Sequence, residues 1–383
     1  MIRITEDHQD IQEMVADFSD HELAPLAEQL DEEQGFPTAN LTKLAELGML
    51  GVTAPEAYGG TGADSLTAVL MIEELARNCG STALVVSAHV FDAIRALTVL
   101  GNDEQKAKWL PGLATGETIG TFAIAEASAE SDAGALATRA VKAGDGWSLT
   151  GEKTAIVSGQ HAGFAAVVAR TTGEPGSTSD LGLFAVSGGA SATGVTATPD
   201  EAPLGTRGTG LADWTFENAA LDGNALLGTE DGFRSIAPVL EASRLGIAAV
   251  ALGVGRGAIT YALGYAAERK AFGRSIDRFG AIRSMVAEAA TALEAARLLV
   301  YRAANLLDDG KSVPRETSMA KLAASRAAYT ATKSAVQILG GNGYSREYPV
   351  ERMFRDAGSL EIHGGSDALH RMLVARALIG ESR

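Results

Sequence analysis

The spacing of apolar residues changes twice along this chain, and that change constrains the fold more than any other feature of the sequence. Up to about residue 116 the apolar residues recur every three to four positions, as Ile11 and Val15 do, which is typical of helices. From there to about residue 228 they form short alternating runs separated by turn-rich segments, which is typical of strands. From Asp231 the helical spacing returns. We therefore expect an α+β protein of three domains: an N-terminal helical domain (1–119), a middle antiparallel β-domain packed as a small barrel or sandwich (120–228) and a C-terminal four-helix bundle (229–383).

The last third of the chain contains its most apolar stretch, Leu245–Ala266. Arg256 interrupts this stretch after eleven residues, whereas a bilayer crossing needs about 20 apolar residues. We therefore expect a buried core helix there and no membrane span. Further helices are predicted from about Ile282 to near Gly310, from about Pro314 to Leu339, and from near Ser366 to the end of the chain.

The charge balance excludes several classes of partner. The net charge is −16, which argues against binding to nucleic acid or docking on an anionic membrane, because both need clustered cations. Cys79 is the one cysteine, so neither an intramolecular disulfide nor a cysteine-based metal site is possible, and no metal site is expected. The polar segment Met1–Asp10 does not resemble a signal peptide. We expect a cytoplasmic protein.

Three glycine-rich segments lie at expected helix ends: Tyr58–Gly62, Gly340–Tyr344 and Gly364–Ser366. Glycine permits the positive φ angles of helix ends, and it also lets backbone N–H groups approach a phosphate. The basic segment Glu268–Arg274 has two interpretations as well, a helix C-terminal cap or an arginine that binds a phosphate across a subunit boundary. Ser366 is a possible N-cap. The residues alone leave these alternatives open.

A series of short motifs, in a fixed order over nearly the whole chain, resembles one enzyme family. The motifs are Pro55–Gly62, Leu149–Lys153, Gly205–Arg207, Glu268–Gly273, Gln337–Tyr344, Glu347–Arg352 and Phe354–Asp356. Together they resemble the acyl-CoA dehydrogenase family. This resemblance agrees with the expected helical, β and helical domains.

The resemblance implies a dimer or tetramer that binds FAD between domains and a neighbouring subunit. It implies α,β-dehydrogenation of an acyl thioester carried by CoA or by an acyl carrier protein, with electrons passed to an electron-transfer flavoprotein. In this reaction a carboxylate removes the α-proton while the β-hydride goes to the flavin. Implied to bind the cofactor are Ser131, Arg269, Phe272, Gln337, Gly340, Gly341 and Ser366, and implied to bind the substrate are Ser131, Glu241 and Arg244.

The sequence departs from the family at the catalytic base. Most members have a glutamate where this chain has Gly364, and a minority carry the base where this chain has Ser243. A glycine has no side chain, and a serine hydroxyl is a weak base by itself. The nearby titratable candidates are His363, Glu241 and Asp367.

The expected flavin pocket departs from the family too. Side chains that usually contact the flavin or its adenosine part are replaced by Ala125, Ala155, Val157, Gly280 and Ala368, and Glu130 places an anion where a glycine usually lets the backbone approach. Each lost hydrogen bond costs on the order of 1 kcal/mol of binding, so FAD is expected to bind more weakly than in the family at large.

Three hypotheses follow. The first is an FAD-dependent acyl-thioester oxidoreductase with a displaced base. The second is a protein with weak or no FAD binding that does other chemistry on an acyl thioester. The third is a non-catalytic subunit that completes the flavin site of a related chain in a heteromer. A homo-oligomer that dehydrogenates an acyl-CoA is placed first, because most of the chain follows the family pattern.

Overall fold

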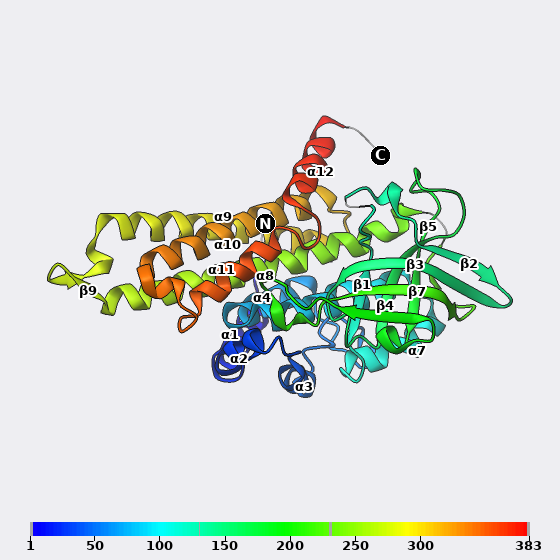
Figure 1. Ribbon diagram of the computed structural model, residues 1–383, viewed down its shortest axis with the longest axis horizontal. Helices are drawn as coiled ribbons and strands as arrows, with labels where there is room; N and C mark the ends of the chain where they lie inside the picture. The colour runs from blue at the N-terminus through cyan, green and yellow to red at the C-terminus, as the bar shows by residue number, and fades with distance from the viewer. Residues whose placement is uncertain (1–2, 130, 230–231, 381–383) are drawn as a thin grey trace.

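The computed structural model describes residues 3–129, 131–229 and 232–380, and it has the three parts that the sequence predicts. Helices form the first part, a β-sheet the second and a bundle of long helices the third (Figure 1). The boundaries predicted at residues 119/120 and 228/229 stay predictions.

The first part contains seven α-helices among the described residues. These are α1 (Glu6–Phe18), α2 (Ala27–Glu32), α3 (Thr38–Glu46), α4 (Ser65–Asn78), α5 (Gly80–Ser87), α6 (Arg95–Leu100) and α7 (Asp103–Ala114). A π-helical segment, η4 (Ala88–Ile94), joins α5 to α6, so that residues 80–100 run as one long helical segment. Asp64 begins α4 as its N-cap, because its carboxylate accepts a hydrogen bond of 2.8 Å from Thr67 N.

The second part is one sheet of eight strands. They are β1 (Gly120–Ala123), β2 (Arg139–Ala143), β3 (Gly146–Ile156), β4 (Phe164–Arg170), β5 (Leu181–Ser187), β6 (Val195–Pro199), β7 (Ala212–Leu221) and β8 (Leu226–Leu227). The order is β6-β7-β3-β2-β4-β5-β8, and β1 pairs with β4. Most pairs are antiparallel as predicted, but β1 and β2 each pair with β4 in parallel. The sequence pattern does not reveal this, because spacing shows which residues are buried and not which strands meet.

The third part is built around α8 (Phe233–Glu268), which packs against α4, α9, α10 and α11. Its other helices are α9 (Gly280–Asp308), α10 (Pro314–Leu339), α11 (Val350–Leu360) and α12 (Asp367–Ile379). A short hairpin, β9 (Lys270–Ala271) and β10 (Arg274–Ser275), lies at the end of the bundle far from the sheet (Figure 1). One apolar core runs through both helical parts.

Two helical segments, Gly80–Leu100 and Phe233–Glu268, are long and apolar enough by composition to cross a membrane. In the fold, 72% and 83% of their most apolar windows are buried within the chain. Leu245–Ala266 is therefore part of a core helix, as predicted. The two segments pack against each other in the middle of the molecule, where the three parts meet.

Candidate functional site

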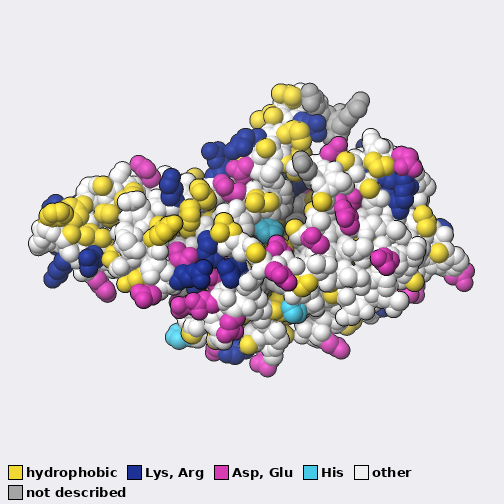
Figure 2. Space-filling view, in the orientation of Figure 1, with side chains coloured by type: hydrophobic (Ala, Val, Ile, Leu, Met, Phe, Trp, Pro, Cys, Tyr) yellow, Lys and Arg dark blue, Asp and Glu magenta, His cyan; other side chains and the backbone are white. Residues whose placement is uncertain are grey.

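A cavity of about 450 Å³ lies where the three parts of the fold meet. Its walls come from α5 and η4, from β1 and β3 with the loop between Ile124 and Leu136, from the first half of α8, and from the loop before α12. Figure 2 shows this face of the molecule hollowed between the protruding α12 and the sheet. Apolar side chains dominate the lining, among them Leu84, Phe122 and Ile247. Such a space suits an elongated, mostly apolar ligand.

Asp92 is a carboxylate in this wall that the sequence analysis missed. It lies in η4, lines the cavity and keeps part of its surface accessible. Burial raises its pKa to about 7, although a hydrogen bond from the Ser243 hydroxyl opposes the shift. One signal was available: Asp92 is an acidic residue within the apolar segment Gly80–Leu100, and an acid in such a segment must be paired, protonated or functional.

Arg244 lines the cavity from α8 beside Ser243. Its residue is 9% exposed, and its Nε has no hydrogen-bond partner within the described structure. Burial lowers the pKa of its guanidinium, against the attraction of Glu241. An unpaired donor in an apolar cavity is a site at which an electronegative ligand atom gains a hydrogen bond.

Glu241 does not line the cavity. Its carboxylate accepts hydrogen bonds of 2.7 Å from Val313 N and 3.1 Å from the Ser312 hydroxyl, at the start of α10. The carboxylate therefore satisfies a free N–H group of that helix and lies near the positive end of its dipole. Its predicted roles as a base and as a substrate contact stay predictions without a contact at the cavity.

The loop before α12 brings His363, Gly364, Gly365 and Ser366 into the lining. Gly364 has a φ of +69°, and a Cβ built there would lie 2.6 Å from Ile247 Cδ1. Burial lowers the pKa of His363 to about 4, so its imidazole is neutral and weakly basic near pH 7. Ser366 accepts a hydrogen bond of 3.3 Å from Leu369 N, which makes it the N-cap of α12.

Asp367, the first residue of α12, does not line the cavity. Its carboxylate accepts hydrogen bonds from the Ser325 hydroxyl and from Arg371, each of 3.3 Å. Of the three sequence candidates for a displaced base, His363 alone therefore lies in the cavity wall.

The sheet side of the cavity presents small side chains. Ser131, Ala125, Ala155 and Val157 all line it. Ala155 has a φ of +54°, and its N–H donates a hydrogen bond of 2.8 Å to Asp213. Because alanine rarely adopts this backbone conformation, the wall is held in place by its neighbours. Glu130, the remaining departure in this loop, lies outside the described residues.

A buried ion pair fixes the loop that carries this wall. The Lys153 ammonium donates hydrogen bonds of 2.6 Å to Glu126 and 2.9 Å to Ile124 O. Glu126 also accepts from the N–H groups of Ala137 and Thr138. Burial lowers the pKa of Lys153 to about 8, against the attraction of Glu126. The pair satisfies each partner's polar atoms and orders the segment between β1 and β2.

A second group of predicted cofactor residues lies elsewhere, at the far end of the bundle. It surrounds the β9–β10 hairpin and the end of α10, and Figure 2 shows hydrophobic side chains gathered there. The side chain of Phe272 is 96% exposed, and a Cβ built at Gly340 or Gly341 meets no atom within 4 Å. Exposed there too, and likewise absent from the cavity lining, are Arg269, Gln337 and Gly280. Within one chain the structure does not bring this group to the cavity.

Ala368, the last departure noted in the sequence, is exposed in the first turn of α12 and does not line the cavity.

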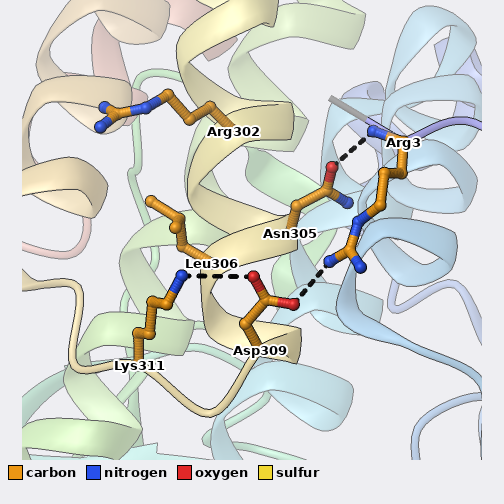
Figure 3. A pocket seen from close by; sticks show the side chains of 6 residues that line it. All are labelled: Arg3, Arg302, Asn305, Leu306, Asp309 and Lys311. Carbon is orange, nitrogen blue, oxygen red and sulfur yellow. Dashed lines mark hydrogen bonds and ion pairs between the residues drawn. The ribbon is translucent and has the colours of Figure 1, made fainter. Parts of the chain in front are cut away.

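A smaller pocket of about 300 Å³ lies beside the C-terminal end of α9 (Figure 3). Arg3 donates from its backbone N–H to Asn305 at 2.7 Å and from its guanidinium to Asp309 at 2.6 Å, and Lys311 also donates to Asp309. These bonds tie the start of the chain to α9. Among the described residues no group of three or more histidine, cysteine, aspartate or glutamate side chains is arranged to hold a metal ion.

Each of the three parts of the chain matches a domain of one protein family. Residues 5–117 match the acyl-CoA dehydrogenase N-terminal domain, residues 121–219 the middle domain and residues 230–379 the C-terminal domain. The mitochondrial short-chain specific acyl-CoA dehydrogenase of Bos taurus is 38% identical over 383 residues, which are 100% of this chain and 92% of that protein.

Solved structures have the same fold. Butyryl-CoA dehydrogenase from Megasphaera elsdenii matches with a TM-score of 0.94 and 32% identity over 99% of this chain and 100% of that one. A chain in a structure of the electron transferring flavoprotein of Acidaminococcus fermentans matches with a TM-score of 0.95 and 37% identity over 99% of both chains. A glutaryl-CoA dehydrogenase from Mycobacterium smegmatis in complex with FADH2 matches with a TM-score of 0.92 and 26% identity over 99% of this chain and 96% of that one.

Proposed function

The chain belongs to the acyl-CoA dehydrogenase family, and on this premise we propose that it catalyses the FAD-dependent α,β-dehydrogenation of an acyl thioester without a glutamate at position 364. One observation carries the proposal. The cavity at the meeting point of the three parts is lined mainly by apolar side chains, and Asp92, Ser243 and Arg244 are among the polar residues of its lining. An acyl chain fits the apolar part, and a thioester carbonyl fits beside the polar groups.

The residues around the cavity fit a flavin ring. The small side chains of Ala125, Ala155 and Val157 leave one wall open to a flat group, and Ser131 and Ser366 add hydroxyl groups to the lining. When bound there, FAD supplies the acceptor for the hydride. The Ile124–Leu136 loop, held by the buried Lys153–Glu126 pair, keeps this wall in a fixed position.

The exposed group at the far end of the bundle fits the rest of the cofactor, if it comes from a neighbouring subunit. Arg269 and Gln337 present charged and amide groups, Phe272 an exposed ring, and Gly340 and Gly341 exposed backbone with open space beside it among the described residues. A guanidinium recognises a diphosphate well. We propose a homo-oligomer in which this group completes a second chain's cavity.

The chemistry removes two hydrogens from adjacent carbons. A base of this chain takes the proton from the α-carbon, the hydride on the β-carbon goes to FAD, and a carbon–carbon double bond forms between them. Hydrogen bonds to the thioester oxygen make the α-proton more acidic. Arg244 is a candidate donor for such a bond, because its Nε is unpaired within the described structure and it lines the cavity. An electron-transfer flavoprotein is the proposed electron acceptor.

A second function, a non-catalytic subunit of a heteromer, is favoured by one observation. Ala125, Ala155 and Val157 carry no side-chain donor or acceptor toward the cavity, whereas Arg269, Phe272 and Gln337 are present and exposed at the far end of the bundle. In such a heteromer, the exposed group around Arg269 completes the flavin site of a related partner chain, and this chain binds little flavin in its own cavity. That the chain resides in the cytoplasm, and that it binds neither nucleic acid nor membranes, stay predictions.

Flavin retention distinguishes the two functions. The purified protein is incubated with excess FAD and desalted, and its visible absorption spectrum is recorded. The proposed dehydrogenase keeps a flavin band close to one FAD per chain. A colourless protein that gains flavin only after co-expression with a related chain overturns the dehydrogenase and supports the heteromer.

A further inference from the structure

We propose that Asp92 is the general base that removes the α-proton of the acyl thioester, in place of the side chain that Gly364 lacks. This inference rests on the proposed function and adds the residue that performs its first chemical step. Three features of the site carry it: the place of Asp92 in the cavity wall, its hydrogen bond to Ser243, and the absence of another enclosed carboxylate in the described lining.

The first feature is position. Asp92 projects from η4, between α5 and α6, into the same cavity that Gly364 borders from the loop before α12. π-Helical segments are rare and cost stability relative to a regular helix, and they are found frequently at functional sites. Here the wider turn places a carboxylate in an otherwise apolar wall.

The second feature is the neighbouring side chain of Ser243. The Ser243 hydroxyl on α8 hydrogen-bonds to the Asp92 carboxylate. This bond stabilises the charged form of the carboxylate, which is the form that accepts a proton. A glutamate at position 243 would place its carboxylate near that of Asp92, so a base at either position would reach the same region of the cavity.

The third feature is the lack of a better candidate in the lining. Among the described lining residues Asp132 is the other carboxylate, but it is exposed at the rim and accepts a hydrogen bond of 2.9 Å from Gly134 N. His363 lines the cavity but binds a proton weakly, because burial holds its pKa near 4. Asp92 is the enclosed acid.

The environment of Asp92 suits proton abstraction near neutral pH. The titratable and charged groups that line the cavity with it are Arg244 from α8, His363 from the loop before α12 and Asp132 from the sheet side. Burial raises the pKa of Asp92 to about 7. A base of this strength is substantially ionised near pH 7, yet binds a proton far better than an exposed carboxylate does.

In the proposed step the acyl thioester loses a proton to Asp92 and a hydride to FAD. The bond between the α-carbon and its hydrogen breaks, and the proton goes to the Asp92 carboxylate. The electron pair of that bond forms the double bond as the β-hydride leaves to oxidised FAD, which is thereby reduced. Asp92 then releases its proton to solvent before the next substrate binds.

The test separates proton abstraction from hydride transfer. The FAD-loaded enzyme is incubated without oxygen or an electron acceptor with butyryl-, hexanoyl- and octanoyl-CoA deuterated at the α-carbon. Mass spectrometry measures the loss of deuterium to solvent, and absorption measures reduction of the flavin. For Asp92→Asn we expect both rates to fall by at least about 100-fold, the usual contribution of a general base, while acyl-CoA binding followed by calorimetry is kept.

Two variants make this result specific. Asp145→Asn removes an exposed carboxylate in the turn between β2 and β3 and is expected to keep both rates within about twofold, as surface substitutions away from a site do. Asp92→Asn combined with Ser243→Glu restores a carboxylate from α8 and is expected to recover at least about tenfold of the lost exchange, if position is what matters.

The outcomes distinguish the inference from the function on which it rests. A wild-type enzyme that reduces its flavin, together with an Asp92→Asn variant that exchanges and reduces at the same rates, overturns the role of Asp92 and leaves the dehydrogenase intact. A wild-type enzyme that holds FAD but neither exchanges nor reduces with these thioesters overturns both.

Discussion

The hydroxyl of Ser243 on α8 hydrogen-bonds to the carboxylate of Asp92 in the π-helical segment η4, in the wall of a cavity that Gly364 also borders. The two residues come from different parts of the fold, so only the folded chain brings them together. The hydrogen bond gives Asp92, a lone acid in an apolar helical segment, a polar partner. Asp92 gives the cavity a carboxylate although position 364 has no side chain.

Replacing Asp92 by asparagine is expected to stabilise the protein at high pH. Folding raises the pKa of Asp92 from 3.8 to about 7. The folded state therefore binds more protons than the unfolded state between these values, and stability falls as pH rises through them. Asparagine removes this loss, so Asp92→Asn gains about 2–4 kcal/mol relative to wild type above about pH 7. Urea unfolding near pH 5 and pH 8 measures the gain; the same difference between the two proteins at both pH values contradicts the raised pKa.

The rate of proton abstraction is expected to rise with pH. Asp92 accepts a proton only when it is ionised, and burial raises its pKa to about 7. Anaerobic flavin reduction by an acyl-CoA is therefore expected to be about tenfold faster near pH 8 than near pH 6. Asp145→Asn keeps this profile. A wild-type rate that stays flat across the same range is incompatible with Asp92 as the base.

Removing the buried Lys153 ammonium is expected to destabilise the sheet part severely. Lys153→Met leaves Glu126 charged, buried and without its ion-pair partner. Such a loss costs about 3–5 kcal/mol. Lys108→Met breaks the exposed pair with Asp222 and is the matched control, with an expected cost below about 1 kcal/mol. Thermal and urea unfolding compare the two variants, and equal costs contradict a structural role for the buried pair.

The secondary structure could be predicted from the sequence largely because burial has a period. The apolar spacing predicted a helix from Pro314 to Leu339, and α10 has these bounds. The same reasoning missed α11 (Val350–Leu360) and β6 (Val195–Pro199). In β6 no residue is buried, so the strand lacks the apolar alternation by which strands are recognised.

The candidate site was predicted in part. Ala125, Ala155 and Val157 were grouped by resemblance, and they line one cavity. Asp92 was missed because a single acid in a helix has no spacing pattern, and its partner Ser243 is far away in sequence. Glu241 and Asp367 were proposed as titratable groups near the positions where the family usually carries its base. Their carboxylates bond instead to the start of α10 and to Ser325 and Arg371.

The backbone at Gly364 is expected to resist any side chain. Its φ is +69°, and a Cβ there would press on Ile247 Cδ1. Gly364→Ala is expected to cost about 1–2 kcal/mol of unfolding free energy, chiefly through the backbone, because the end of the Ile247 side chain can move. Gly358→Ala in α11 is the control, since a Cβ there meets no atom within 4 Å and alanine favours the helix. Urea unfolding tests the pair; Gly364→Ala as stable as wild type contradicts the strain.

Arg269 is expected to hold FAD from a neighbouring chain. Its side chain is exposed at the end of the bundle, outside the cavity lining. Loss of a charge-assisted hydrogen bond to a phosphate costs about 1.5–3 kcal/mol, so Arg269→Ala is expected to weaken FAD binding at least about tenfold without changing the unfolding midpoint of the apoprotein. Lys333→Ala, which removes an exposed charge from α10, serves as the control. Fluorescence titration with FAD measures both variants, and equal affinities rule out this contact.

Oxidation of an acyl thioester by this chain with a bound flavin is measured by anaerobic titration of the FAD-loaded protein with butyryl-, hexanoyl- and octanoyl-CoA while its visible spectrum is recorded. We expect at least one of them to bleach the oxidised flavin band and to yield the α,β-unsaturated acyl-CoA, identified by mass spectrometry. A flavin band that all three thioesters leave unchanged, in protein shown by calorimetry to bind them, contradicts the proposed oxidation.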